Sequence, residues 1–292
     1  MIAIRPRDLA LLIGITLIWG VNLITSKVGV AEIPPILFTF LRFLIVVLAL
    51  APVLRIHPGQ MGTLTLAAML TGALNFALNF AGLKRATNVS SVAIMTQLGV
   101  PFATLLSVAM LGEHVRWRRI TGIALSFVGV VIIGFDPQIG DRWESVALVV
   151  ASAFFGALGL IIVKKLHDFG PAELLGWTYL ISLPPLLAVS LAIEHPSFDQ
   201  LRGVSWQAWG ALLFSALVAS LIAHTGYYTL VQRYPVTSVA PLTTLSPVFS
   251  IVLGVFLLDD QLTSRILVGG ACTLLGVLII TLRERRIVDT GT

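Results

Sequence analysis

The sequence predicts an all-α integral membrane protein in which ten transmembrane helices form two inverted five-helix repeats around a central cavity. The first observation is composition: 57% of the 292 residues are hydrophobic, only 11% are charged, and the mean hydropathy is +0.96, whereas soluble domains carry about 25% charged residues. The second is that apolar residues occur in blocks of about 20, the length that crosses a hydrocarbon core of about 30 Å. The third is a resemblance between the two halves of the chain.

The predicted spans follow one another with short connections, which leave no room for an extramembrane domain. Residues 1–140 form the first predicted repeat and residues 141–292 the second. The first apolar block is too long for the core of a signal peptide, and no small-residue cleavage site follows it, so we expect a retained helix. In chain order the spans are 8–30, 35–54, 62–83, 87–110, 118–135, 144–166, 171–193, 206–232, 235–258 and 264–282.

Basic residues are distributed unevenly between the two sides of this bundle. Of the 19 Lys and Arg residues, Arg42 lies inside a span and twelve lie on the side of the N-terminus. The remaining six are Lys27, Lys84, Arg85, Arg142, Arg202 and Arg265. An excess of Lys and Arg in short loops marks the cytoplasmic side. We therefore predict a multi-pass protein of the cytoplasmic (inner) membrane with both termini in the cytoplasm, and no binding of nucleic acid despite the net charge of +5.

The two halves match at a constant offset. The segment SSVAIMTQLGVPFATLL, which begins at residue 90, resembles TSVAPLTTLSPVFSIVL, which begins at residue 237, so the offset is 147. Near the start of each half, WGVNLITSKVG resembles FGALGLIIVKKL. Because each half has five helices, an odd number, the second half enters the membrane from the opposite side, as in many secondary transporters.

Prolines interrupt the fourth and ninth spans at nearly matching places. Pro101 corresponds to position 248, one residue from Pro247, and Pro241 adds a second break in the ninth span. A proline inside a helix removes a hydrogen bond and kinks the chain. Interrupted helices at matching positions of two repeats point to a substrate site near the midplane, so we expect these prolines to act as kinks or gates. The alternative is that they only shape packing.

Glycines seven residues apart occur in the last span of each half. They are Gly122 and Gly129 in the fifth span and Gly269 and Gly276 in the tenth. This spacing keeps small residues on one face and lets a neighbouring helix approach closely. We expect these two spans to pack as a scaffold away from the substrate, with a dimer interface as the alternative.

These features together resemble the EamA-type branch of the drug/metabolite transporter superfamily. The resemblance rests on the two repeats, on LIWGVNLITSK in the first span, and on LGE followed by RRITGIALSFVGVVII. Within that branch the chain is most similar to exporters of aromatic and other amino acids. The resemblance implies ten helices, a central cavity and alternating access. The segment LLDDQ departs from the pattern because it carries two aspartates, Asp259 and Asp260.

Polar and aromatic residues inside five of the spans are the candidate lining of the cavity, because polar groups in lipid usually face the bundle interior. Their amide and hydroxyl groups suit a carboxylate, and their rings suit an apolar or aromatic side chain or a cation. The alternative is hydrogen bonding between helices. The predicted substrate-binding residues are Trp19, Asn22, Asn75, Phe76, Asn79, Thr96, Gln97, His224, Tyr227, Tyr228, Thr243 and Thr244.

Three titratable residues within the spans have more than one interpretation. His224 is a candidate proton relay, although a lone histidine is more often a satisfied interior hydrogen-bonding group. Lys27 lies near the outer end of its helix and is expected to extend to the interface. Arg42 is expected to extend toward the interface or to pair with a carbonyl group, and a gating role remains open.

The absence of certain residues narrows the function. No Asp or Glu occupies the centre of a predicted span, which disfavours a carboxylate-switched cation antiporter and leaves a facilitator or exchanger as plausible. No H-E-x-x-H motif, paired midplane aspartates or Ser–His pair suggests an intramembrane enzyme, and we predict no metal or cofactor. The prediction is an exporter of amino acids and related metabolites, acting as a monomer or weak homodimer, with drugs, organic cations or nucleosides as the alternative substrates.

Overall fold

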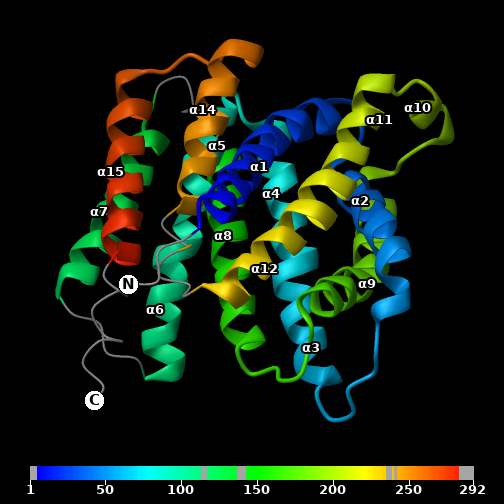
Figure 1. Cartoon of the computed structure of the whole chain (residues 1–292). Helices are drawn as coiled ribbons and strands as arrows, with labels where there is room; N and C mark the ends of the chain where they lie inside the picture. Colours follow the sequence, from blue (N-terminus) through cyan, green and yellow to red (C-terminus); the bar gives the residue numbers. More distant parts are fainter. Residues whose placement is uncertain (1–4, 113–116, 137–142, 235–238, 240–241, 283–292) are drawn as a thin grey trace.

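The computed structural model describes residues 5–112, 117–136, 143–234, 239 and 242–282. Within these residues the chain is a helical bundle, and nine helical segments are long and apolar enough to cross a membrane. The predicted span 235–258 is represented by a shorter apolar helix, α14 (Leu245–Leu258). Figure 1 shows how the helices pack side by side at different tilts. The prediction of an all-α membrane fold with ten spans is confirmed.

The helices follow the predicted order. The first repeat consists of α1 (Pro6–Glu32), α2 (Pro35–Leu50) continued by η1 (Ala51–Val53), α3 (Met61–Ala68), η2 (Met69–Leu74), α4 (Asn75–Arg85), α5 (Val89–Met95), η3 (Thr96–Leu98), α6 (Gly99–Leu111) and α7 (Trp117–Gly134). The second consists of α8 (Trp143–Val163), α9 (Pro171–Val189), η5 (Ser190–Glu194), the short α10 (Phe198–Arg202), α11 (Trp206–Leu213), η6 (Phe214–Ala223), α12 (His224–Arg233), α14 and α15 (Ser264–Leu282). Several begin with proline, which fits the first helical position because its missing N–H has no partner there.

The paired prolines lie just after local changes in helix geometry. The fourth span changes from α5 through the 3-10 turn η3 into α6, and Pro101 is the third residue of α6. Pro247 is likewise the third residue of α14. The helical path of the fourth span is continuous across η3, because the N–H of Gly99, the first residue of α6, bonds the carbonyl of Thr96. The predicted interruptions are present as these changes in helix geometry; Pro241 lies outside the described residues.

The packing of the helices has the pattern of a two-fold repeat. Helix α1 contacts α14 in the second repeat, and its equivalent α8 contacts α6 in the first. Helix α4 packs on α8, just as η6 and α12 pack on α1. The equivalent helices α2 and α9 contact each other, as do α7 and α15, which lie side by side at the left of Figure 1. The most extensive helix–helix contacts therefore each join one helix of the first repeat to one helix of the second.

Helices α7 and α15 pack through their small residues. A Cβ atom on Gly269 would lie 2.5 Å from the carbonyl oxygen of Gly129, and one on Gly276 would lie 2.5 Å from that of Gly122. Between these contacts, the hydroxyls of Ser126 and Thr273 each donate to the other's backbone carbonyl at 3.4 Å. The predicted tight packing of the fifth and tenth spans is confirmed. The glycine faces are covered within the chain and are not exposed for a dimer interface.

Carboxylates at the span ends cap helices of the other repeat. Glu32 accepts hydrogen bonds from the backbone N–H and hydroxyl of Ser205, both at 2.6 Å, at the start of α11. Glu194 accepts from the N–H groups of Ile36 (2.7 Å) and Leu37 (2.9 Å) at the start of α2. These N-terminal N–H groups lack intrahelical partners, and the helix dipole favours an anion beside them. The acidic residues that the sequence places outside the membrane centre thus join the two repeats.

Asp259 and Asp260 have separate structural roles. Asp259 ends α14 in the left-handed conformation (φ 55°), as Gly112 ends α6 (φ 68°) at the equivalent position, 147 residues earlier. The Asp260 carboxylate accepts from the N–H and hydroxyl of Ser90, both at 2.7 Å, and so caps α5. The equivalent of Asp260 in the first repeat, Glu113, lies outside the described residues. Asp259 thus stands where the first repeat has a glycine, Gly112.

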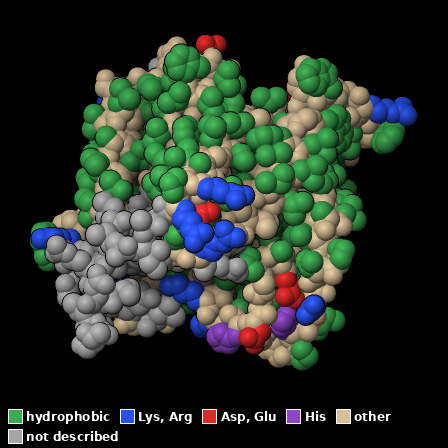
Figure 2. Space-filling view, in the orientation of Figure 1, with side chains coloured by type: hydrophobic (Ala, Val, Ile, Leu, Met, Phe, Trp, Pro, Cys, Tyr) green, Lys and Arg blue, Asp and Glu red, His purple; other side chains and the backbone are tan. Residues whose placement is uncertain are grey.

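The outer surface suits a lipid environment. Large apolar side chains are exposed at many positions, and Trp206, Phe256 and Ile193 each expose at least 70% of their surface. Figure 2 shows hydrophobic side chains over the upper part of one face and a group of basic side chains lower down. A pocket between the ends of α1 and α12 is lined by Arg5, Arg7, Asp8, Leu11, Gly226, Thr229 and Arg233. The molecule is a multi-pass membrane protein.

Candidate functional site

A buried cluster of aromatic and polar side chains forms where helices of both repeats converge. Its members, which we call the central cluster, are Trp19 of α1, Arg42 of α2, Phe76 and Phe80 of α4, Tyr179 of α9, Ser220 of η6, and His224 and Tyr227 of α12. Because five spans from both halves contribute, a solute here would contact both repeats at once. That is the position expected for a substrate in an inverted-repeat transporter.

Arg42 lies inside the cluster and not at the membrane interface. The side chain is only 2% exposed. Its guanidinium carbon lies 5.0 Å from the ring centre of Phe76 and 5.5 Å from that of Phe80, and its Nε donates to the Ser220 hydroxyl at 2.9 Å. The expected extension toward the interface is therefore wrong. Arg42 was not among the predicted site residues, although an arginine within an apolar span is itself a signal of a functional interior position.

Trp19, His224 and Tyr227 pack ring against ring. The Trp19 ring centre lies 5.2 Å from that of His224 and 5.3 Å from that of Tyr227. The Nδ1 atom of His224 is 2.7 Å from the carbonyl oxygen of Ala219. Since a carbonyl only accepts, Nδ1 carries the proton, and in the neutral ring Nε2 is an acceptor. The structure brings three of the predicted site residues together here.

Irregular helix precedes the site at matching places in the two repeats. The π-helical segment η2 leads into Asn75 at the start of α4, and the π-helical segment η6 leads into His224 at the start of α12. Such segments are rare and occur frequently at functional sites, because the wider turn changes which side chains face the interior. In η6 the Ser220 hydroxyl donates to the carbonyl of Ser215 five residues earlier. No sequence signal identified these segments.

Several polar atoms of this region lack a hydrogen-bond partner although they are buried. Among the described residues these include the Trp19 indole Nε1, the Asn22 Oδ1 and the Tyr179 hydroxyl. Buried polar groups are paired in the great majority of cases, so each such group requires an explanation. The first is a donor, the second an acceptor, and the third can be either. A bound solute with both donor and acceptor groups would satisfy them.

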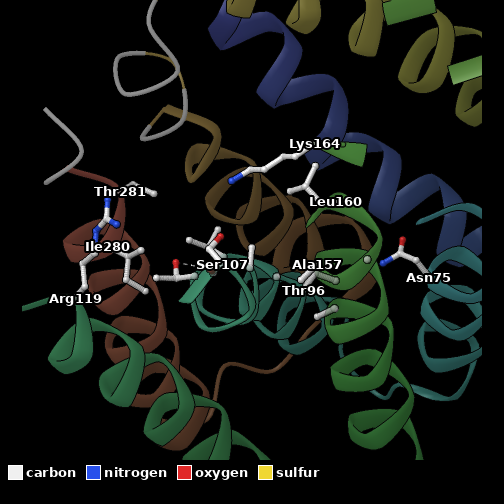
Figure 3. Close-up of a pocket in the computed structure, with 15 residues that line it drawn as sticks. Asn75, Thr96, Ser107, Arg119, Ala157, Leu160, Lys164, Ile280 and Thr281 are labelled. Atoms are coloured by element: carbon white, nitrogen blue, oxygen red, sulfur yellow. Dashed lines mark hydrogen bonds between the residues drawn. The ribbon is translucent and has the colours of Figure 1, made fainter. Parts of the chain in front are cut away.

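A pocket of about 430 Å³ adjoins this region on one side of the bundle. It is lined by Asn75, Thr96, Gly99, Val100, Ala103, Thr104, Ser107, Arg119, Ala153, Gly156, Ala157, Leu160, Lys164, Ile280 and Thr281. In Figure 3, Asn75 and Arg119 lie at opposite ends of the labelled set, with Thr96 and Ser107 between them. Lys164 follows α8 and Thr281 lies near the end of α15, so the pocket reaches the side of the bundle on which α15 ends.

The predicted site residues divide between these two places. Asn75 and Thr96 line the pocket, and Phe76, the next residue after Asn75, contacts the central cluster. Asn75 donates to the carbonyl of Ser152 on α8 at 2.7 Å, and Asn79 approaches the Ser152 hydroxyl at 3.4 Å. Gln97, Thr243 and Thr244 are partly buried beside the helix breaks. The side chain of Tyr228 lies outside the described part of the chain. Whether all of these residues bind substrate stays a prediction.

Lys27 is bound at the end of α4, next to the connection between the third and fourth spans. Its ammonium group donates to the carbonyls of Leu83 (2.8 Å), Lys84 (3.2 Å) and Ala86 (2.6 Å). The last carbonyls of a helix lack intrahelical partners and carry partial negative charge. Lys27 therefore ties α1 to the end of α4.

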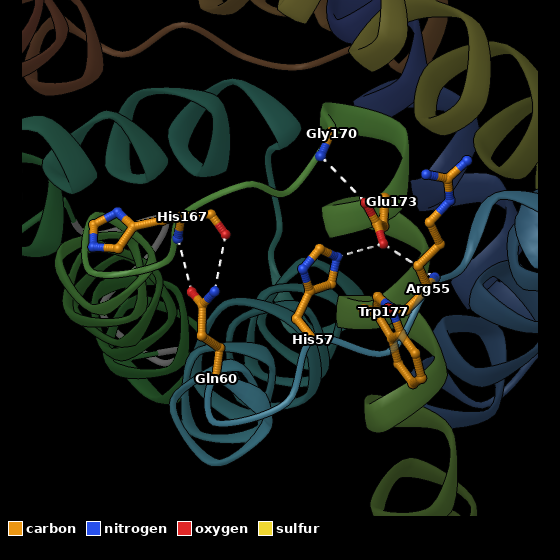
Figure 4. Close-up of polar contacts among 7 residues, drawn as sticks. All are labelled: Arg55, His57, Gln60, His167, Gly170, Glu173 and Trp177. Carbon is orange, nitrogen blue, oxygen red and sulfur yellow. Dashed lines mark hydrogen bonds and ion pairs between the residues drawn. The ribbon is translucent and has the colours of Figure 1, made fainter.

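The loops on the pocket side connect the two repeats. His57 Nε2 lies 2.9 Å from a carboxylate oxygen of Glu173, which also accepts from the N–H of Arg55 at 3.0 Å. Gln60 exchanges two hydrogen bonds with the backbone of His167, at 2.8 and 3.1 Å. Figure 4 shows these contacts as two neighbouring groups between the loop after α2 and the loop before α9. This pairing, which we call the loop contact, holds the α2 and α9 ends together beside the pocket.

Comparison with known proteins identifies similar chains. The model of the EamA-like transporter family matches residues 8–135 and again residues 143–282. A probable amino-acid metabolite efflux pump of Escherichia coli (strain K12) is 28% identical, and the alignment covers 98% of this chain and 99% of that protein. A probable amino-acid metabolite efflux pump of Salmonella typhimurium (strain LT2) is 30% identical over 94% of each chain. A solved crystal structure shares the fold with a TM-score of 0.63 at 19% identity, covering 97% of this chain and 99% of the other.

Proposed function

The chain belongs to the EamA-like transporter family, and we propose that it exports amino acids and related small metabolites across the cytoplasmic membrane by alternating access. The family and the named relatives indicate a transporter and not an enzyme. The observation that carries the proposal is the central cluster, in which side chains from five spans surround buried, unpartnered donors and acceptors. Two relatives that match over nearly the whole chain bear the name of probable amino-acid metabolite efflux pumps.

The chemistry of the site favours a small zwitterion over the alternatives. A zwitterion needs donors for its carboxylate and acceptors for its ammonium group. Arg42 and the Trp19 indole are donors, and Asn22 Oδ1 is an acceptor. The aromatic rings of the cluster suit an apolar side chain. Organic cations, one of the alternative substrate classes, would meet the buried charge of Arg42, and nucleosides carry no charge for it to bind.

Alternating access in this fold requires that the repeats separate in turn on each side of the site. The pocket beside α6 and α8 is the proposed route from the side on which α15 ends, which the distribution of basic residues assigns to the cytoplasm. The changes in helix geometry near Pro101 and Pro247 are the proposed bending points, because a proline inside a helix removes a hydrogen bond and favours a kink. We propose the loop contact as the cytoplasmic closure.

Efflux from liposomes tests the proposal. Vesicles that contain the purified protein are loaded with an equimolar mixture of amino acids, and the losses are followed by mass spectrometry with and without a pH gradient. We expect selective loss of a subset of amino acids and slower loss with Asn75→Ala plus Asn79→Ala. Gln207→Ala, which removes an exposed amide on α11, is the control and should leave the rate unchanged. Loss no faster than from empty vesicles, with folded protein, would refute amino-acid export.

A further inference from the structure

The buried guanidinium of Arg42 has a chemical environment that defines a class of ligand. We propose that Arg42 binds the carboxylate of the transported solute, so that the substrates are amino acids or other organic acids with an apolar body. This inference rests on the proposed function and names the group of the substrate that the site recognises. It also excludes organic cations that lack a carboxylate from the set of good substrates.

Arg42 is placed deep in the bundle. It lies seven residues after Pro35, the start of α2, which corresponds to about 10 Å along the helix axis, and only 2% of it is exposed. An arginine within a spanning helix is costly to insert into a membrane. Residues that carry such a cost face the bundle interior, pair with an opposite charge, or mark a substrate pathway.

Arg42 has no anionic partner in the part of the chain that the structure describes. Among the described residues no carboxylate lies within ion-pair distance of its guanidinium. Its Nε is used by the Ser220 hydroxyl, while the rings of Phe76 and Phe80 offer electrostatic attraction but no hydrogen-bond acceptor in the plane of the guanidinium. A guanidinium has five N–H donors in a fixed fork that matches a carboxylate in two parallel bonds. The remaining N–H groups of the Arg42 guanidinium are therefore the donors to which a carboxylate ligand would bind.

The groups around Arg42 also suit a carboxylate with an apolar body. The Tyr179 ring centre lies 6.2 Å from that of Phe76, on which Arg42 also packs, and the Tyr179 hydroxyl is buried without a partner. Phe43 stacks on the Tyr179 ring at 3.8 Å, with the rings 5° from parallel, and so fixes its position. A fixed hydroxyl beside an arginine can donate a further bond to the same carboxylate. The walls that surround these two polar groups are aromatic, which suits a solute with an apolar side chain.

Two other roles would also explain a buried arginine. Arg42 could serve packing alone, since its bond to Ser220 joins α2 of the first repeat to η6 of the second. It could also bind a small inorganic anion such as chloride. The three roles differ in which solute should stabilise the protein. Packing predicts no dependence on solute, and an inorganic-anion site predicts that chloride alone suffices.

The experiment compares four solutes that share a phenyl ring. These are phenylalanine, phenylalanine amide, 3-phenylpropionate and phenethylamine, of which only the first and third carry a carboxylate. Binding to the purified protein in nanodiscs is measured by thermal unfolding and by calorimetry, in chloride and in a chloride-free buffer. The variants are Arg42→Gln, Arg42→Lys and the control Arg202→Gln, which removes an exposed arginine that lies 4.6 Å from the ring of Phe198.

We expect phenylalanine and 3-phenylpropionate to bind at least about 30-fold more tightly than the amide and the amine, since loss of one partner of a buried charge pair has about this effect or more. Arg42→Gln should abolish this preference, Arg42→Lys should keep part of it, and Arg202→Gln should keep all of it. A preference that survives in Arg42→Gln, or stabilisation by chloride with no response to carboxylates, overturns the inference.

Efflux of the same four solutes separates this inference from the proposed function. If wild-type vesicles release phenylalanine and Arg42→Gln does not change the preference for the acid over the amide, the inference fails while the transporter function stands. If carboxylates bind through Arg42 and no solute leaves the vesicles, the transporter function fails and the carboxylate site stands. Should Arg42→Gln not fold, Arg42→Lys and the Tyr179→Phe variant still report on the preference.

Discussion

Replacement of Asp260 by alanine tests how the two repeats are joined at the end of α14. The Asp260 carboxylate is 6% exposed and accepts two hydrogen bonds of 2.7 Å from Ser90, which is fully buried at the start of α5. Alanine removes this cap and leaves the backbone N–H of Ser90 buried without a partner. We therefore expect Asp260→Ala to lower the stability of the folded protein substantially.

The magnitude follows from two contributions. The Ser90 N–H left buried without a partner costs about 1–3 kcal/mol, and loss of the second hydrogen bond, from the Ser90 hydroxyl, costs about 1 kcal/mol, so the sum is about 2–4 kcal/mol. The adjacent Asp259 is the matched control, because its φ of 55° is one that glycine adopts without strain. Asp259→Gly should leave stability unchanged or raise it by about 1 kcal/mol. Ser90→Ala keeps the backbone hydrogen bond and should cost less than Asp260→Ala.

Thermal unfolding of the purified protein in one detergent measures these differences. For a chain of this size, about 2–4 °C of Tm corresponds to 1 kcal/mol, so Asp260→Ala should lower Tm by about 4–16 °C while Asp259→Gly should not lower it. The double variant Ser90→Ala plus Asp260→Ala should show less than the sum of the two single effects, because the partners share one contact. Equal losses for the two aspartates, or additive losses for Ser90 and Asp260, would refute the capping role.

Three further predictions follow from the close contacts. Gly269→Ala should cost about 1–3 kcal/mol because its Cβ would lie 2.5 Å from a carbonyl of α7, whereas Gly14→Ala, with open space around it, should be neutral in the same unfolding assay. Gly156→Ala should displace the side-chain amide of Asn75 and break its hydrogen bond to the Ser152 carbonyl, which should slow efflux about fivefold. An unchanged efflux rate would show that this amide does not contribute to transport. Glu173→Ala should remove the hydrogen bonds of Arg55 and His57 and so weaken the loop contact. We expect faster backbone hydrogen exchange in the loop that follows α2 and little change in α7.

The helices and repeats could be predicted because they depend on local and periodic features of the sequence. Blocks of apolar residues mark spans whatever their neighbours, and the offset of 147 between the halves predicted which helices are equivalent. The spacing of Gly122 and Gly129 predicted a close helix contact, which α7 and α15 form. The prolines predicted interruptions in the fourth and ninth spans. They did not predict the 3-10 turn that precedes Pro101, because the geometry of that turn depends on how it packs.

The sequence alone determined that this protein is a two-repeat membrane bundle of a transporter family, since hydropathy, charge distribution and internal similarity are properties of the chain itself. The orientation of the Arg42 side chain, in contrast, depends on the tertiary structure. An arginine within a span can reach the interface or turn inward, and the difference depends on contacts with Phe76 and Ser220, which lie 34 and 178 residues away. The same reason applies to the Tyr179 hydroxyl and the Trp19 indole N–H, which are buried without a hydrogen-bond partner. Whether a partner on a distant helix lies within reach is determined only when the helices have packed.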